Sequence, residues 1–300
     1  MTIPSVTGAF VPSASMSPAE SAFILDEGRP HRHTLWDEAK LLAWELLQYP
    51  LDRAGTCFRR DVDHVARQFE TAYDITLEQW VRNVSSGRLA QRFRDRLFHV
   101  NSWFRGALYN RLLSGVIVQF GARSALEVGC GVGMNLTGLA LKDDSLMLTG
   151  LDYSHNGIVR GRELLSRPPA DLVRMAGQEG AERKDLQRRV RLVQGSAFDI
   201  PFPDKSFDLS FTVNVLEQMP HRYKDALREM CRVSRGHCLF IESFRECNSL
   251  AQRFHLRRMD YFRFSHRTFE PLGLKPLGFF TDFPQKLSHR AGLLICAVAC

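Results

Sequence analysis

Hydrophobic positions change their spacing once along the chain, near residue 120. Before that point they recur every three or four residues, as in the stripe formed by Val62, Val65, Phe69 and Tyr73, a spacing typical of helices. After it, short runs rich in β-branched and aromatic residues alternate with helical stretches. That alternation predicts an α/β fold in which helices cover both faces of a mostly parallel sheet.

The part before the change divides into two. Residues 1–33 are rich in Ser, Pro and Ala with weak periodicity, so we expect a flexible N-terminal arm. Residues 34–121 should form a helical cap or appendage. Its first helix should be capped by Thr34 and stopped by Pro50, and a later helix should run over 89–104.

Residues 122–300 are expected to form the main domain. Its strands are predicted by seven apolar runs: SALEVG, LMLTGLD, VRLVQGS, FDLSFTVN, HCLFIES, KPLGFFTDF and AGLLICAVA. Only a short connection separates the last two, which should pair as an antiparallel hairpin at a sheet edge. After the fifth run, Arg245–Arg267 mixes arginine with aromatic residues. We interpret it as a candidate substrate lid, although a solvated basic helix would have the same composition.

Composition adds limits. The net charge is +7, and only seven of the 40 basic residues are lysines, which gives an anionic partner modest support. The seven cysteines have no metal-ligand spacing, so we expect reduced thiols and no metal site. There is no signal-peptide pattern and no apolar run near the ~20 residues that span a bilayer. We therefore expect a cytoplasmic protein without a membrane partner.

The sequence EVGCGVGMN, residues 127–135, is the strongest candidate for a ligand loop. Glycines after a first strand let a ligand approach the backbone, and the following helix N-terminus carries partial positive charge. The spacing is G-x-G-x-G, and Met134 stands where a dinucleotide-binding loop has its third glycine. A pyrophosphate would gain nothing from Glu127. A ligand with an amino group fits better.

This loop and three later motifs resemble the class I S-adenosylmethionine-dependent methyltransferases. LEVGCGVG resembles their first motif, and LTGLDYS resembles the second, in which an acid ends strand two. GSAFDIPFPDKSFDLSF and NVLEQMP resemble signatures of the type 11 branch. The resemblance covers residues 122–300. It implies a Rossmann-like seven-stranded sheet and S-adenosyl-L-methionine as the cofactor.

Position by position, the resemblance implies roles in cofactor binding. Glu127 would help to hold the amino group, Asp152 would accept from the ribose hydroxyls, and Tyr153 would lie beside the adenine. The family usually has Asp at Ser196 and often His at Gln218, so adenine recognition and a His base there are in doubt. The implied cofactor-binding residues are Glu127, Gly129, Cys130, Gly131, Gly133, Asn135, Asp152, Tyr153, Ser196, Ala197, Phe198, Asn214 and Leu216.

Methyl transfer requires alignment of the nucleophile and, for a hydroxyl or ammonium acceptor, removal of a proton. Open α/β sheets bind ligands at the carboxyl ends of their strands, so candidate bases are sought after strands four and five. These candidates are Glu217, His221 and His266, with Glu242 and His255 as further options. Substrate contacts are assigned to Arg257, Arg258 and Tyr261 in the candidate lid, and catalysis is expected to need no metal.

Three functions compete. A small-molecule methyltransferase, acting on oxygen or nitrogen of an anionic or aromatic metabolite, agrees best with the type 11 resemblance. An RNA or protein methyltransferase is supported by a pI of about 9.2 and by arginine clusters, but NVLE replaces the fourth motif used on base amines. A binding protein without activity is the third. A homodimer through the N-terminal helices also stays open.

Overall fold

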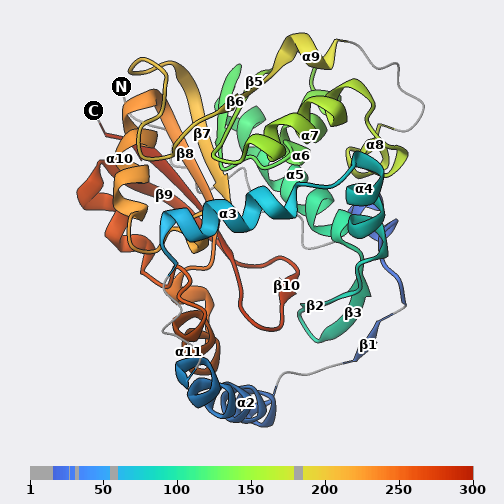
Figure 1. The fold of residues 1–300 in the computed structure, drawn as a ribbon, viewed down its shortest axis with the longest axis vertical. Coiled ribbons are helices and arrows are strands. Elements are labelled where there is room, and N and C mark those ends of the chain that lie inside the picture. The colour runs from blue at the N-terminus through green and yellow to red at the C-terminus, as the bar shows by residue number, and fades with distance from the viewer. Residues whose placement is uncertain (1–15, 27, 31–33, 55–59, 179–184, 300) are drawn as a thin grey trace.

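The structure, a computed structural model, describes residues 16–26, 28–30, 34–54, 60–178 and 185–299 (Figure 1). Within them, a seven-stranded sheet has the order β6-β5-β4-β7-β8-β11-β9. The strands are β4 (Ser124–Val128), β5 (Met147–Asp152), β6 (Val190–Gln194), β7 (Phe207–Val213), β8 (Ser234–Glu242), β9 (Leu274–Phe280) and β11 (Gly292–Val298). The first five in this order are parallel, while β11 runs antiparallel to β8 and β9. The predicted sheet and its antiparallel edge hairpin are confirmed.

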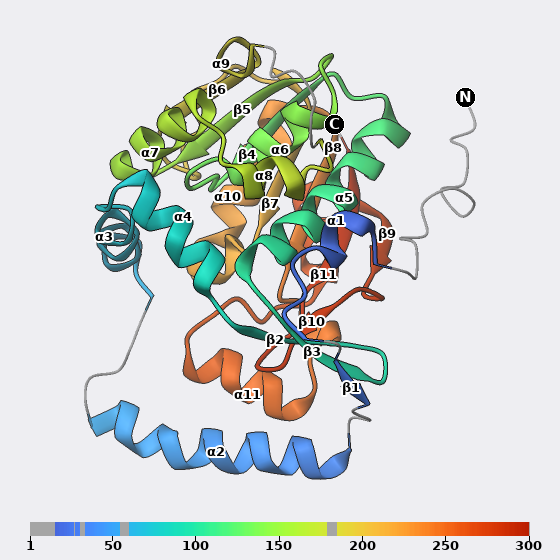
Figure 2. The same ribbon diagram turned by 90° about the vertical axis from the view of Figure 1, so that its right-hand side faces the viewer.

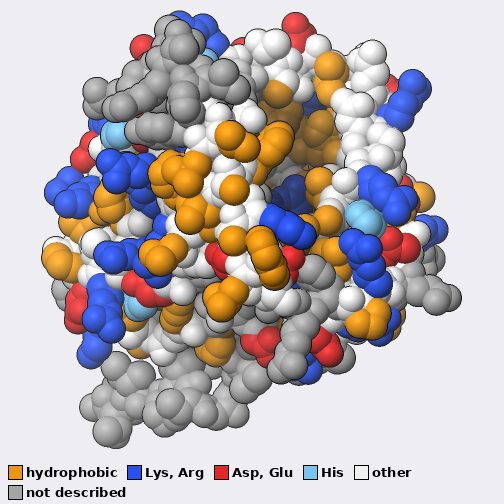
Figure 3. All heavy atoms as spheres, turned by 90° about the horizontal axis from the view of Figure 1, so that it is seen from below, with side chains coloured by type: hydrophobic (Ala, Val, Ile, Leu, Met, Phe, Trp, Pro, Cys, Tyr) orange, Lys and Arg blue, Asp and Glu red, His pale blue; other side chains and the backbone are white. Residues whose placement is uncertain are grey.

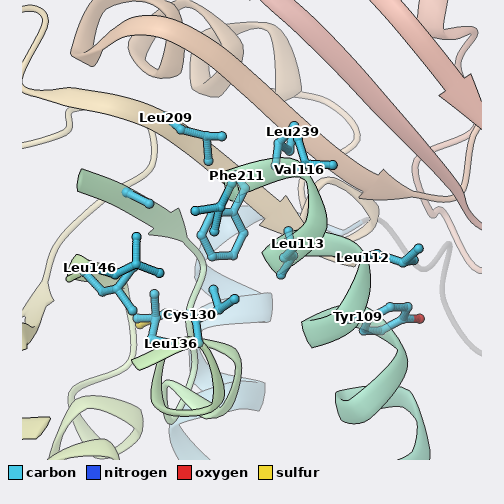
Figure 4. Packing of buried hydrophobic residues seen from close by; sticks show 14 of the residues in the cluster. Tyr109, Leu112, Leu113, Val116, Cys130, Leu136, Leu146, Leu209, Phe211 and Leu239 are labelled. Atoms are coloured by element: carbon cyan, nitrogen blue, oxygen red, sulfur yellow. The ribbon is translucent and has the colours of Figure 1, made fainter. Parts of the chain in front are cut away.

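Helices cover both faces of this sheet. The helices that follow its parallel strands or precede β4 are α5 (Ser102–Phe120), α6 (Met134–Lys142), α7 (His155–Ser166), α8 (Ala170–Met175), α9 (Leu186–Arg189) and α10 (Tyr223–Val233). Figure 4 shows α5 placing Leu113 and Val116 near Phe211 of β7 and Leu239 of β8. On the opposite face, α10 packs with buried residues of β7 and β8. Alternate residues of each strand therefore contribute side chains to two hydrophobic cores, one on each face of the sheet.

The N-terminal region departs from the predicted helical cap at residues 89–104. Residues 89–100 form a β-hairpin of β2 (Leu89–Phe93) and β3 (Arg96–Val100). This hairpin pairs with β1 (Arg29–Pro30) and with β10 (Gln285–Lys286), which lies in the connection between β9 and β11. The predicted helix over 89–104 is therefore wrong for 89–100, and α5 begins only at Ser102.

Two further expectations about this region are corrected. The helix α2 (Leu35–Ala54) continues through Pro50. Residues 16–26 are packed against the body instead of forming a flexible arm: α1 (Pro18–Ser21) buries Glu20, whose carboxylate pairs with Arg111 of α5. Residues 1–15, the first part of the predicted arm, lie outside the described residues.

The remaining helices are α3 (Val62–Ala72), α4 (Leu77–Ser86) and α11 (Leu250–Arg258). A capping box of Thr76 and Gln79 begins α4, and Gly87 is its C-cap residue. Figures 1 and 2 place α2 and α11 side by side at one end of the molecule, while α3 crosses the open ends of the parallel strands. Over the part of the chain that the structure describes, no helix combines the length and the apolar character needed to cross a bilayer.

Candidate active site

A cavity of about 220 Å³ lies at the carboxyl ends of β4, β5, β6 and β7. One wall consists of the loops that follow these strands. The other wall is α3 with its C-cap residue, which contribute Val62, Val65, Ala66, Phe69 and Tyr73. Asp152 is the one acid among the residues that line the cavity, and none of these residues is a Lys, Arg or His. The cavity therefore favours a neutral or cationic ligand over a pyrophosphate.

The glycine loop after β4 is held in conformations that favour glycine. Gly129, Gly131 and Gly133 have φ of 74°, 54° and 70°, and Gly133 is the N-cap of α6. The loop is fixed by hydrogen bonds from Gly129 N to Leu151 O (2.7 Å) and from Gly131 N to Asp152 Oδ2 (2.7 Å). A Cβ at Gly131 would lie 2.6 Å from the hydroxyl oxygen of Tyr73. The bare backbone thus faces the cavity.

Asp152 is the last residue of β5, and its carboxylate links the glycine loop to the start of α7. Besides the bond from Gly131, its Oδ1 accepts from the backbone N–H of Ser154 (2.9 Å) at the start of α7. Burial raises the pKa of Asp152, although these backbone hydrogen bonds oppose the rise. The carboxylate lines the cavity and retains lone pairs beyond these two bonds, so it can accept from ligand hydroxyls.

Glu127 lies behind the loop in the central strand β4 and is only 2% exposed. Its Oε1 accepts from Asn135 Nδ2 (2.7 Å), while Oε2 has no hydrogen-bond partner among the described residues. Burial raises the pKa of Glu127 to about 8. A buried carboxyl oxygen without a partner is costly, so a cationic donor in the adjacent loop would relieve it.

The structure brings most of the predicted cofactor residues together. Those that line the cavity are Gly129, Gly131, Asp152, Tyr153, Ser196, Ala197, Phe198 and Asn214. Five others, Glu127, Cys130, Gly133, Asn135 and Leu216, are not part of the lining. Asn214 has a φ of 56°, unusual for a residue other than glycine, at the point where β7 meets the cavity.

The α3 wall was not predicted from the sequence, which indicated a core stripe instead. Its apolar side chains face the cavity, and Tyr73 covers the glycine loop. Burial, with the nearby acids Asp152 and Glu127, raises the pKa of Tyr73, so its hydroxyl remains a donor. No residue of α3 itself is fully buried.

The α3 wall is anchored at both ends. At its C-terminal end, the Glu70 carboxylate accepts from Ser154 Oγ (2.6 Å) and from the backbone N–H of Asn156 (3.3 Å), at the N-terminus of α7. Just before α3, the Arg60 backbone N–H donates to Asp260 Oδ2 (2.8 Å), and its guanidinium lies over the Tyr261 ring, 4.4 Å from the centroid. Polar contacts at the ends thus hold an apolar wall.

Glu217 is close to the cavity but does not line it. Gln218, which lines the cavity, donates from Nε2 to Glu217 Oε1 (3.3 Å). Burial would raise the pKa of Glu217, but His289 and the charges of Lys286 and Arg105 outweigh burial and lower the pKa to about 2. A carboxylate with so low a pKa binds a proton weakly and makes a poor general base near neutral pH.

His289 and Lys286 were missed in the sequence. His289 Nε2 lies 3.6 Å from Glu217 Oε2, and Lys286 Nζ lies 3.3 Å from His289 Nε2. Both residues come from the connection between β9 and β11, which the sequence suggested to be merely short. The polar run QKLSHR within an otherwise apolar hairpin is the signal that could have drawn attention to them.

The other two predicted catalytic residues lie further away. His221 Nε2 contacts Asp260 Oδ2 at 2.7 Å, on the outer side of the Arg60 anchor. His266 stacks on Phe279 of β9, with ring centroids 4.5 Å apart, and pairs with Glu246. Neither histidine lines the cavity.

The predicted substrate residues are spread over the outside of α11 and its C-terminal loop. Arg257 is exposed, and Arg258 donates to the buried Glu45 of α2. Tyr261 contacts Arg60 but does not line the cavity. Beyond Tyr261, Phe262 is buried against Tyr223 of α10, with centroids 5.2 Å apart. The C-terminal part of the candidate lid, at Phe262, therefore belongs to the layer that covers the sheet.

The sheet order, the glycine loop and the acid that ends β5 together define the class I methyltransferase architecture. Residues 126–241 match the family model of the type 11 methyltransferase domain. This part of the chain is therefore similar to class I S-adenosylmethionine-dependent methyltransferase domains of type 11.

Relatives match this part of the chain. The 27-O-demethylrifamycin SV methyltransferase of Amycolatopsis mediterranei is 27% identical over 41% of this chain and 39% of its own length. The fatty-acid O-methyltransferase of Mycolicibacterium smegmatis is 33% identical over 40% of this chain and 37% of its own. The chain thus spans well under half the length of these relatives. A solved SAM-dependent methyltransferase from Methanosarcina mazei aligns with a TM-score of 0.47 and 15% identity, over 61% of this chain and 97% of that one.

The family implies S-adenosyl-L-methionine as cofactor, and the residues present fit it. Glu127 offers an unpartnered buried oxygen for an ammonium group, and the space beside Gly131 would be filled by any Cβ. Asp152 can accept from hydroxyls, while Ala197 and Phe198 offer apolar surface for a planar ring. Ser196 lines the cavity where the family usually has Asp, whereas Asp199 is exposed and does not.

Proposed function

We propose that this chain is an S-adenosylmethionine-dependent methyltransferase that methylates an oxygen or nitrogen atom of a small molecule with an apolar body. The observation that carries the proposal is the cavity itself. Its loop wall offers Asp152 and bare glycine backbone to a cationic, hydroxyl-bearing cofactor, with the unpartnered oxygen of Glu127 buried behind the loop, and its α3 wall offers apolar side chains to the acceptor.

When bound, the cofactor supplies a methyl carbon activated by its sulfonium. The acceptor lone pair forms the new bond to that carbon as the carbon–sulfur bond breaks, and the bonding pair stays on sulfur as a thioether. A hydroxyl or ammonium acceptor also gives up a proton. The protein aligns the partners and excludes water, which is the work of the glycine loop and of α3.

Glu217 is proposed as a positioning residue rather than as the base. It remains ionised because of His289, Lys286 and Arg105, and it orients Gln218 at the cavity edge. Among the predicted bases, His221 and His266 stay predictions without a contact to the cavity lining. Catalysis without a metal also stays a prediction.

The nature of the acceptor is supported by the cavity and by the relatives. A largely apolar cavity suits a small molecule better than a polynucleotide, which would need a basic groove. The names of the two relatives above specify 27-O-demethylrifamycin SV and fatty acids as acceptors. An RNA or protein acceptor is the alternative.

The test is to incubate the purified chain with methyl-labelled S-adenosylmethionine and with separate small-molecule, RNA and protein fractions of a cell extract. Label in an extractable small molecule, absent with Gly131→Val, is the expected result. Label in RNA or protein would establish the alternative. Cofactor binding without labelling of any fraction would indicate a binding protein.

A further inference from the structure

The helix α2 buries a charged side chain against the body of the protein and exposes apolar side chains to solvent, the reverse of the usual arrangement. Among its described side chains, at positions 35–48, the buried residue is Glu45, which is 2% exposed and contacts His255 Nδ1 (2.8 Å) and Arg258 Nε on α11. Buried ion pairs hold their partners in one geometry, and breaking one leaves an uncompensated charge. The contact with α11 therefore fixes which face of α2 points outward.

The outward face is apolar. Its members share high exposure, between 36% and 89%, and they are Leu35, Trp36, Leu42, Trp44, Leu46 and Leu47, which we call the α2 band. At 3.6 residues per turn, these side chains project over about half of the helix circumference, on the side away from Glu45. The described residues contain twelve large exposed hydrophobic side chains, so this one helix carries half of them.

Positive charges lie beside the α2 band. Lys40 is exposed within the same sector of α2, and Arg257 is exposed on the neighbouring α11, whereas the acids Asp37 and Glu38 are half-buried on the side of Glu45. Figure 3 views this end of the molecule and shows a band of hydrophobic side chains with Lys and Arg on both sides. The whole chain carries a net charge of +7.

From these observations we infer that α2 is an interfacial helix that docks the protein on an anionic lipid surface. A helix with a broad apolar face that includes tryptophan, and with basic residues beside that face, binds in the plane of the headgroups. Tryptophan prefers this interface, and each nearby cation is attracted by anionic lipids. The inference stands independently of the proposed function.

A second copy of the chain fits the α2 band less well. A two-fold interface would bring the same patch of both copies together, so the positive charges of Lys40 and Arg257 in one copy would approach those of the other. An anionic surface neutralises these charges instead. The sequence predicted no membrane partner because no run could span a bilayer, but a helix lying on the surface needs no such run.

The test is sedimentation of the full chain with phosphatidylcholine vesicles that contain or lack about one-third phosphatidylglycerol. Wild type should bind the anionic vesicles, and high salt should weaken the binding. Trp36→Glu/Trp44→Glu should lower the bound fraction at least about tenfold. The matched control is Val118→Glu/Met147→Glu, which replaces two apolar residues of comparable exposure (71% and 54%) elsewhere and should bind like wild type.

A second measurement uses wild type alone. Of the four tryptophans, Trp103 is buried and Trp80 is half-buried, so brominated lipid should quench mainly Trp36 and Trp44. The inference is overturned if wild type does not bind anionic vesicles and brominated lipid does not quench tryptophan emission. It is equally overturned if the double variant binds as well as wild type. Light scattering that shows a dimer, made monomeric by the double variant, without vesicle binding would assign the α2 band to a second copy.

Discussion

The two walls of the cavity are built in different ways. The loop wall depends on backbone: three glycines with positive φ, hydrogen bonds between neighbouring loops, and the central strand β4, four of whose five residues are buried. The α3 wall depends on side chains of a helix without a fully buried residue, held at its ends through Arg60 and Glu70. A rigid wall suits the constant cofactor, and a more weakly held wall suits entry of the ligands.

The largest expected effect comes from the loop wall. Gly131→Val should abolish cofactor binding, because its Cβ would occupy the space beside Tyr73 and the residue would be strained at a φ of 54°. Calorimetry should show a Kd raised more than about a hundredfold, which is about 2.7 kcal/mol, with an unchanged far-ultraviolet spectrum. Normal binding by a folded variant would place the cofactor elsewhere.

Glu127→Gln should weaken cofactor binding about tenfold or more, since a charge-assisted hydrogen bond to the ammonium group would be lost. In wild type the pKa of Glu127 is raised to about 8 without ligand, so binding an ammonium requires loss of a proton below that pH. Affinity should therefore rise with pH up to about 8. The variant should lose this part of the pH dependence.

The same substitution should stabilise the protein without ligand at pH 8. A carboxyl whose folded-state pKa is raised above its ordinary 4.5 contributes stability at low pH, and this contribution is lost as the pH rises through about 8. Gln does not ionise, so the variant does not lose stability as the pH rises. Thermal melts should therefore show a higher Tm for Glu127→Gln than for wild type at pH 8. A Tm below that of wild type at pH 8 would mean that the buried carboxylate has a partner.

Glu70→Ala tests the α3 wall and should have a smaller effect. Without its bonds to Ser154 and Asn156, the end of α3 loses its hold on α7, and each such bond is worth about 1 kcal/mol. Kd for the cofactor should rise about threefold to tenfold. Glu163→Gln at the other end of α7 is the control and should bind like wild type. A rise in Kd as large as that of Gly131→Val would mean that the two walls contribute equally to cofactor binding.

The smallest effects are expected from the arginines once assigned to the substrate. Arg257→Ala should leave KM and kcat unchanged, because the residue is exposed and outside the cavity lining. Arg258→Ala should loosen α2, because it removes a partner of the buried Glu45, and proteolysis within α2 should accelerate. A raised KM in Arg257→Ala would restore the substrate role.

The loop wall could be predicted from the sequence and the α3 wall could not. Gly129, Gly131 and Asp152 act through local backbone geometry, so short motifs reveal them. Tyr73, Lys286 and His289 reach the site only through packing between segments distant in sequence. The β2–β3 hairpin was missed because Arg94 and Asp95 make its turn, without the Asn-Gly or Asp-Gly signal, and because its apolar residues recur at four-residue spacing.

Calorimetric titration of the wild-type chain with S-adenosylmethionine, with NAD as the comparison ligand, tests the central claim most directly. The glycine spacing, the unpartnered oxygen of Glu127 and the absence of Lys, Arg and His from the lining residues all favour the sulfonium cofactor. The account predicts one-to-one binding of S-adenosylmethionine and no heat from NAD. Binding of NAD without binding of S-adenosylmethionine would contradict it.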